Sequence, residues 1–260
     1  MTRSGSLVAR VLTLEATFDG KFPNDSGSVI MCSTLTQSPF MSTRARTHEQ
    51  KSFRREQILG AAHTLLTETG YDGFAMAPLA RRADVAKGTL YLYFTTREEV
   101  LLALCVRYVD QWIEALRPEL QAGMTDGDYA ERFFVAAYGV ENLMCLIARL
   151  EQTIEHNVAI DRFIETKRTF HQQIELIAVP TSTALAIDLD TSFALLQSLV
   201  VLLVGTAVTD QGPNVAEEVL PEDVRNLVDQ FSAKPLFVNT ARHIIAGVRA
   251  DALSHLGVDA

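Results

Sequence analysis

The chain has 260 residues, 48% of them hydrophobic, and its formal net charge is −9. This composition supports a globular protein of one large domain or two modest ones, and an evenly spread negative charge would exclude a nucleic-acid partner. The charge is uneven, however. Residues 44–97 carry nine basic and five acidic side chains, whereas residues 98–260 carry eleven basic and twenty-four acidic ones. The sequence therefore indicates a small basic head attached to an acidic body.

Residues 1–43 show no hydrophobic periodicity and are rich in Ser, Thr and Gly, which is typical of irregular chain. Their apolar run LVARVL is too short for the apolar part of a signal peptide. We interpret residues 1–43 as a disordered N-terminal extension. Because Met41 begins a second natural start, MSTRARTHEQ, the first forty residues are also a candidate for an upstream translation artefact.

Three short helices are predicted in the head. Apolar residues recur at the spacing of one buried face from Arg54 onward, and Gly70 predicts the end of this first helix. A second helix is expected over Met76–Ala83, and a third over Ala86–Tyr93 after a tight turn at Asp84. Three short helices with a three-residue turn between the last two form a helix-turn-helix.

The body is predicted to be helical throughout. After TTREE, where Thr95 or Thr96 supplies a cap, a long helix runs to Arg117. The other expected helices cover 127–139, 141–155, 158–178, 191–208 and the segment from Pro235 onward, and residues 209–234 are expected to form a long loop that holds at most a short helix. No strand pattern stands out, so the predicted fold class is all-α.

The segment 191–208 contains no charged residue over eighteen positions, which is close to the lower limit for a membrane span. A helix buried in a dimer explains the same pattern, and Gln197, Ser198 and Thr206 interrupt it. We therefore favour a dimer helix and expect no membrane contact. Cys32, Cys105 and Cys145 are too few and too widely spaced for a disulfide framework or a zinc site, which fits a cytoplasmic protein.

The stretches ILGAAHTLLTETGYDGF and LARRADVAKGTLYLYFTTREEVLLAL resemble the DNA-binding head of the TetR family of bacterial transcriptional regulators. The resemblance is dense over residues 54–104 and is one of helical architecture beyond them. It implies a helix-turn-helix domain over 44–97 and a helical effector-binding and dimerisation domain over 98–260. The implied partners are a palindromic operator in double-stranded DNA, an unknown small-molecule effector and a second copy of the chain, paired through 191–208 and 235–249. It implies no cofactor.

The resemblance also implies which residues contact DNA. Lys87 is expected on a phosphate, Gly88 at a close approach of backbone and DNA, and Thr89 on a base edge or a thymine methyl group. The phenolic hydroxyls of Tyr91 and Tyr93 are expected on bases or phosphates. Further phosphate contacts are expected from the start of the long helix and from the basic arm before the first helix; these residues are Arg97, Arg54 and Arg55.

The sequence departs from the family pattern at three positions. Ala75 and Ala86 stand where a Ser or Thr usually caps the second and third helices, and each missing cap costs about 1 kcal/mol. Asp84 replaces the usual turn glycine, which is tolerable because Asp accepts a left-handed backbone better than most residues. Operator affinity is therefore expected to depend more strongly on the basic arm.

Candidate effector contacts are aromatic and polar side chains of the body. These are Trp112, Phe134, Tyr138, His156, Asn157 and His171. Such a mixture suits an apolar pocket with a few polar anchors, although aromatic residues at helical spacing are more often plain core. His156 and His171 lack neighbouring ligands at metal-binding spacing, so no metal site is expected.

The function predicted from these patterns is that of an effector-controlled transcriptional regulator, most simply a repressor released from its operator, with an activator as the alternative within that class. An enzyme or ligand carrier with a vestigial head is the first rival, but no nucleophile elbow, phosphate loop, metal motif or acid–base pair appears. A membrane-associated interaction protein is the second rival.

Overall fold

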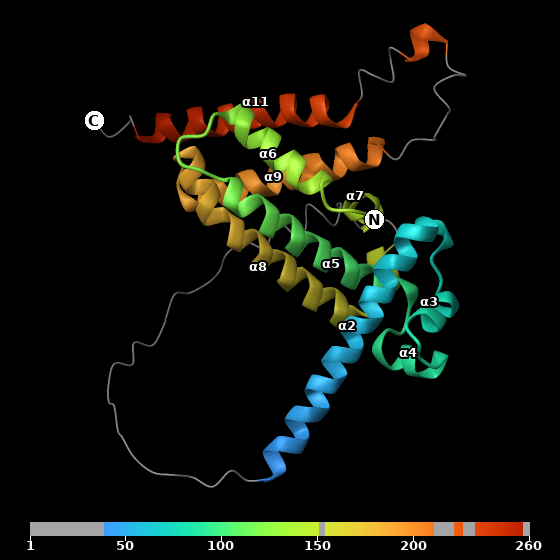
Figure 1. Ribbon diagram of the computed structural model, residues 1–260. Coiled ribbons are helices and arrows are strands. Elements are labelled where there is room, and N and C mark those ends of the chain that lie inside the picture. The colour runs from blue at the N-terminus through green and yellow to red at the C-terminus, as the bar shows by residue number, and fades with distance from the viewer. Residues whose placement is uncertain (1–38, 151–153, 211–220, 226–231, 257–260) are drawn as a thin grey trace, which may run out of the picture.

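The computed structural model describes residues 39–150, 154–210, 221–225 and 232–256. Every regular element in these ranges is helical, and no strand occurs within them. Figure 1 shows three helices forming a small head beside a larger helical body. The all-α prediction is therefore confirmed. Residues 1–38 of the expected N-terminal extension lie outside the described residues.

The head has the predicted three helices, which are α2 (Pro39–Gly73), α3 (Met76–Arg82) and α4 (Lys87–Tyr93). The spans of α3 and α4 agree with the expectation to within one residue at each end. α2 begins at Pro39 rather than near Arg54, so residues 39–43 are helical instead of belonging to the extension. Gly70 breaks its last turn with a φ of 67°, in the left-handed region that glycine adopts without strain.

The turn between α3 and α4 contains the left-handed residue that the sequence predicted. Asp84 adopts a φ of 51°, and the Val85 N–H donates to the Ala80 carbonyl at 3.0 Å. Neither Ala75 nor Ala86 provides a side-chain cap. The pair of short helices is held instead by burial of apolar side chains such as Leu79 and Leu90, which are fully buried.

The body consists of α5 (Arg97–Leu116), η1 (Arg117–Glu119), α6 (Asp126–Tyr138), α7 (Leu143–Ile147), η3 (Glu155–Asn157), α8 (Ile160–Leu185), α9 (Leu189–Asp210) and α11 (Ala233–Leu256). α5 leaves the head and runs into the body between α8 and α6, and α11 packs on α6 and α9 (Figure 1). The Thr96 hydroxyl accepts from the Glu99 N–H at 3.1 Å, which confirms the expected cap of α5.

Two helices differ from the sequence prediction. The described part of the segment expected to be one helix over 141–155 is instead divided into the short α7, π-helical residues at 150 and 154, and the 3₁₀ turn η3, and Asn142 adopts a left-handed φ of 64° immediately before α7. α8 does not end before Pro180 but continues to Leu185. Pro180 cannot donate to the carbonyl of Leu176, yet Leu176 lies on the exposed side of the helix, where solvent can satisfy that carbonyl.

The expected long loop over 209–234 falls mostly outside the described residues. Within the described part, α9 continues to Asp210, residues 222–225 are helical, and α11 has begun by Ala233.

Candidate nucleic-acid interface and effector site

Four of the eight residues expected to contact DNA lie on the accessible surface of α4. Lys87 and Gly88 are exposed, Thr89 is half-buried, and Tyr91 is 40% exposed. A Cβ added at Gly88 would meet no atom within 4 Å, so the protein itself gives no packing reason for a glycine there. Lys87 Nζ lies 6.0 Å from the centroid of the Tyr91 ring. This face is available to a partner outside the chain.

Leu92 is the residue of α4 that the sequence reasoning missed. Its side chain is 79% exposed, more than that of any other exposed large hydrophobic residue in the described chain. It lies about 200° around the helix from the buried Leu90, because each residue turns an α-helix by about 100°. Counting residues around the helix from Leu90 would have placed Leu92 outward from the sequence alone.

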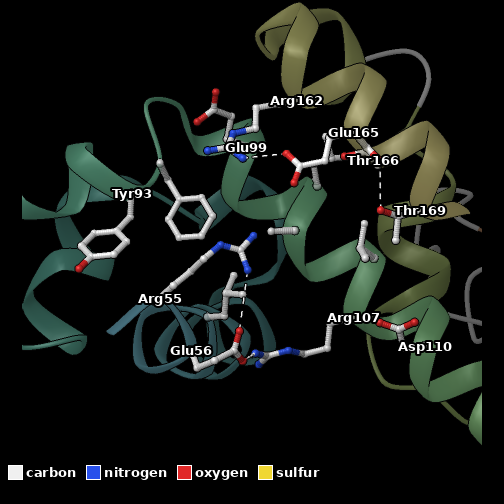
Figure 2. A pocket seen from close by; sticks show the side chains of 15 residues that line it. Arg55, Glu56, Tyr93, Glu99, Arg107, Asp110, Arg162, Glu165, Thr166 and Thr169 are labelled. Carbon is white, nitrogen blue, oxygen red and sulfur yellow. Dashed lines mark hydrogen bonds and ion pairs between the residues drawn. The ribbon is translucent and has the colours of Figure 1, made fainter. Parts of the chain in front are cut away.

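Two other residues expected at the DNA, Tyr93 and Arg55, line a cavity at the junction of head and body. Figure 2 shows both in the wall of a cavity of about 320 Å³ between the head and the body. The cavity is lined from the head by α2 and α4 and from the body by α5 and α8. A DNA contact by either residue therefore stays a prediction, and their present environment is the junction of the two domains.

The guanidinium of Arg55 lies at the edge of this junction, and its side chain is 45% exposed. Its guanidinium lies 5.2 Å from the centre of the Phe94 ring and 3.8 Å from the carboxylate of Glu56. Burial lowers the pKa of Arg55, Glu56 opposes that change, and nearby Arg162 adds to the lowering. Glu56 also pairs with Arg107 of α5, so an ion pair links the head to the body (Figure 2).

Arg97 is held by the head rather than extended towards solvent. Its guanidinium donates to the Tyr71 carbonyl and lies 4.6 Å from the centre of the Tyr71 ring. Arg54, by contrast, is exposed. Arg97 thus fixes the end of α2 to the start of α5 in this structure, and its expected phosphate contact stays a prediction.

Replacement of Lys87 by Ala is expected to weaken binding to every DNA sequence. The negative slope of log affinity against log salt concentration should become shallower by about one unit, because one phosphate contact is lost. The measurement is fluorescence anisotropy of labelled duplexes over a range of salt concentrations. Lys234→Ala is the matched control, because Lys234 is exposed on α11 and pairs with Glu131 at 2.7 Å. An unchanged slope in Lys87→Ala would remove Lys87 from the phosphate contacts.

Three of the six candidate effector residues lie in one aromatic cluster at the centre of the body. Trp112 meets Phe133 edge-on with ring centres 4.9 Å apart, and Phe134 stacks on Tyr138 at 4.0 Å. Phe237 of α11 joins the two pairs, at 5.7 Å from Phe133 and 5.4 Å from Phe134. Trp112, Phe134 and Tyr138 therefore belong to one aromatic cluster.

This aromatic cluster contains two buried polar atoms without a hydrogen-bond partner among the described residues, Trp112 Nε1 and Tyr138 Oη. Buried polar groups are normally hydrogen-bonded, so each such group calls for a partner. Burial raises the pKa of Tyr138 to about 12, with a further contribution from Asp210, so its hydroxyl stays protonated and able to donate at neutral pH.

The other three candidate residues lie elsewhere. His156 and Asn157 are exposed on η3, where the Asn157 carbonyl accepts from the Thr96 hydroxyl at 3.3 Å. His171 is exposed on α8, with its ring 5.2 Å from that of Phe193 and Nε2 3.4 Å from Glu175. The structure does not bring these residues to the aromatic cluster, because η3 and the outer face of α8 point away from it. Within the described ranges no group of three His, Cys, Asp or Glu side chains is arranged to hold a metal ion.

The corner between α6 and α7 contacts one stripe of α2. The stripe consists of His63, Thr67 and Tyr71: His63 and Thr67 are four residues apart and share one face of the helix, and Tyr71 follows the break at Gly70. Asn142 Nδ2 donates to Thr67 Oγ1 at 2.9 Å, and the Arg149 guanidinium lies 4.8 Å from the Tyr71 ring centre. The body therefore holds α2 along two turns, outside the α5 connection.

His63, the third member of the stripe, also contacts the body. Its Nδ1 lies 2.8 Å from the hydroxyl of Tyr108 on α5, and its Nε2 lies 3.9 Å from the Glu141 carboxylate in the α6–α7 corner. Both α5 and the corner thus meet α2 at this histidine.

Two family descriptions match almost the whole folded chain. Residues 58–104 match "Bacterial regulatory proteins, tetR family", and residues 106–252 match "Tetracyclin repressor-like, C-terminal domain". The boundary between the two matches falls inside α5, which is the helix that connects head and body.

Individual relatives are similar over about a third of the chain. The chain is 34% identical to the fatty acid metabolism regulator protein of Bacillus subtilis (strain 168) over 77 residues, covering 30% of this chain and 40% of that protein. It is 35% identical to the HTH-type transcriptional activator FasR of Mycolicibacterium smegmatis over 85 residues, covering 33% and 38%. The match thus spans about two fifths of the length of these curated relatives. A TetR regulator of Streptomyces coelicolor has a similar structure with a TM-score of 0.49 at 20% identity, covering 75% of this chain and 97% of that one.

Proposed function

Because the chain belongs to the TetR family of bacterial regulatory proteins, we propose that it is a cytoplasmic repressor that binds a palindromic operator as a homodimer and is released by a small-molecule effector. It is a regulatory protein and not an enzyme. The similar protein FasR is named as an activator. That this chain is a repressor, and that its effector releases it from the operator, are therefore both parts of the proposal.

The observation that carries DNA binding is the outer face of α4. Gly88, which has open space around it, and the exposed Leu92 stand on the side opposite the buried Leu90, and the exposed Lys87 lies in the first turn of the helix. None of these choices improves the packing of the head, and glycine weakens a helix by about 1 kcal/mol relative to alanine. They suit a helix whose backbone lies close to the major groove.

The experiment that tests this proposal is selection of genomic DNA. Purified protein is incubated at near-physiological salt with sheared DNA from its own organism, and the retained fragments are sequenced. We expect one palindromic motif. Retention without any sequence preference, with and without a cell extract as a source of effector, would contradict the proposal.

The proposed dimer is supported by a stripe on α9. Its exposed positions alternate in steps of four and three residues, which is the spacing of a seam between two helices; they are Ala194, Ser198, Val201, Gly205 and Val208. The small members allow close approach, and Val201 and Val208 are 46% and 47% exposed in the single chain. α11 has the same spacing of exposed residues at Asn239, His243, Ala246 and Ala250.

α9 is the one described helix that is long and apolar enough to cross a membrane, with 39% of its most apolar window buried inside the chain. α9 packs against α8 and α11. A second copy covering the α9 stripe accounts for the rest of its apolar surface without a membrane, which is why we retain the dimer interpretation.

The proposed effector site is the aromatic cluster. An apolar molecule with hydrogen-bond acceptors fits its chemistry, because Trp112 Nε1 and Tyr138 Oη are both buried donors that lack partners. Trp112 lies on α5 and Tyr138 near the end of α6. Binding between them would therefore move the helix that leads into the head and the helix that leads into the α6–α7 corner.

The route from this site to the head has two branches. α5 carries Trp112 and continues directly to the head, while α6 ends at the corner whose Asn142 donates to Thr67 of α2. Arg149, just after α7, contacts Tyr71 of α2. Displacement of either helix changes the angle of α2, and with it the separation of the two heads in a dimer. By linkage, operator DNA must affect effector binding by the same factor.

Asn142→Gly is expected to weaken this coupling without disturbing the fold, because glycine keeps the left-handed φ of 64° and removes only the side-chain amide, which donates to Thr67 and also interacts with the Tyr108 hydroxyl on α5. Hydrogen exchange measured with and without operator DNA checks this without requiring the effector. In the wild type the operator should slow exchange in both α2 and the α6–α7 corner; in Asn142→Gly it should slow exchange in α2 alone.

Asn157→Gly is the control, because Asn157 meets the head through its backbone carbonyl and the wild-type pattern should persist. Equal protection of the corner in wild type and Asn142→Gly would show that the Asn142–Thr67 hydrogen bond does not transmit the signal.

A further inference from the structure

The surface of α4 that points directly away from the protein is apolar. Gly88 and Leu92 are four residues apart and therefore lie one above the other on the helix. The buried face on the opposite side contains Leu90 and Phe94. The polar residues expected to bind DNA, Lys87 and Tyr91, lie to one side of this outward line rather than on it.

An apolar outward line restricts what α4 can recognise. Leucine has no hydrogen-bond donor or acceptor, so Leu92 gains nothing from a phosphate or from the polar edges of bases. The thymine C5-methyl group is the apolar group that an unmodified base pair presents in the major groove. The open space around Gly88 lets the backbone approach closely enough for the leucine to reach it.

We propose that Leu92, with the clearance provided by Gly88, recognises the methyl group of a thymine in each operator half-site. The proposal rests on the proposed function and adds to it a specificity-determining residue and the base that it selects. The neighbouring residues keep separate roles. Lys87 positions the helix on the phosphate backbone, and Thr89, half-buried at the edge of the face, is left for a polar base contact.

The test replaces single thymines of the selected operator by deoxyuridine, which lacks the methyl group and keeps every hydrogen-bonding atom. We expect one position in each half-site at which this change weakens wild-type binding about fourfold, and about fifteenfold when both half-sites are changed, since each buried methyl group contributes on this scale. Leu92→Ala should bind the thymine operator more weakly by a similar factor and should not distinguish thymine from deoxyuridine.

The controls separate this inference from the proposed function. Val135→Ala removes an exposed apolar side chain from α6 and should keep the wild-type preference for thymine. An unchanged unfolding temperature in Leu92→Ala will show that the head is intact. If the wild type selects a palindrome but tolerates deoxyuridine at every position, or if Leu92→Ala keeps the full preference, the thymine contact is wrong and the proposed function stands. If the wild type selects no sequence, both fall.

Discussion

Val201→Glu is expected to be a monomer at micromolar concentration and to bind its operator about 100-fold more weakly than the wild type. Val201 stands in the middle of the α9 stripe, where twofold symmetry places two copies of any substitution close together. Two carboxylates would be buried there without a partner. Without the dimer, the second head loses the effective concentration that links the two half-sites, and this contributes about 10²-fold or more.

Sedimentation equilibrium and operator titration measure the two effects of Val201→Glu separately. Val179→Glu is the matched control, because Val179 is 60% exposed on α8 and lies outside the predicted seam. It should remain dimeric with wild-type affinity. A dimeric Val201→Glu protein would contradict the seam on α9, and a monomeric Val179→Glu protein would move the interface to α8.

Gly88→Ala is expected to make the protein more stable and a weaker DNA binder. A Cβ at this position meets nothing within 4 Å in the protein, and alanine favours a helix over glycine by about 0.5–1 kcal/mol. In the complex the same methyl group would stand between the backbone of α4 and the groove. We expect operator affinity to fall about tenfold or more, which corresponds to about 1.4 kcal/mol.

Gly60→Ala is the control for the stability and the DNA affinity of Gly88→Ala. Gly60 is also helical, exposed and without an atom within 4 Å of its added Cβ, but it lies on α2. Thermal unfolding should show stabilisation in both variants, and anisotropy titration should show reduced affinity only in Gly88→Ala. Wild-type affinity in Gly88→Ala would mean that α4 does not approach DNA closely at that residue.

The parts of the fold that the sequence predicts well are those determined by local chemistry. Asp84 adopts the left-handed conformation of the turn between α3 and α4, Thr96 caps α5 ahead of two acidic side chains, and Gly70 interrupts α2. Each acts within a few residues of itself, so a short stretch of sequence contains the necessary information. The spans of α3 and α4 follow from these signals.

The features that sequence reasoning missed depend on contacts between distant segments. Whether a residue ends a helix depends on its surroundings. α8 continues through Pro180, whereas the chain at Asn142 leaves the helical conformation before α7. Arg97 was expected at DNA because its position matches the family pattern, yet Tyr71, 26 residues earlier, holds its guanidinium.

The candidate effector residues illustrate the same limit. Trp112 and Tyr138 were grouped with His156 and His171 by residue type, and only the tertiary fold separates the buried aromatic cluster from the exposed η3 and α8 residues. The outward position of Leu92, by contrast, follows from counting residues around one helix and was open to prediction.

The most direct test of the central claim is a titration of the wild-type protein on its selected operator and on the same duplex with one half-site scrambled. Two α4 helices of one dimer, each in its own half-site, predict one dimer per intact operator and a loss of affinity of about 100-fold or more on the scrambled duplex. Equal affinity for the two duplexes would contradict the account, because it would show that a single head, or a surface other than α4, binds the DNA.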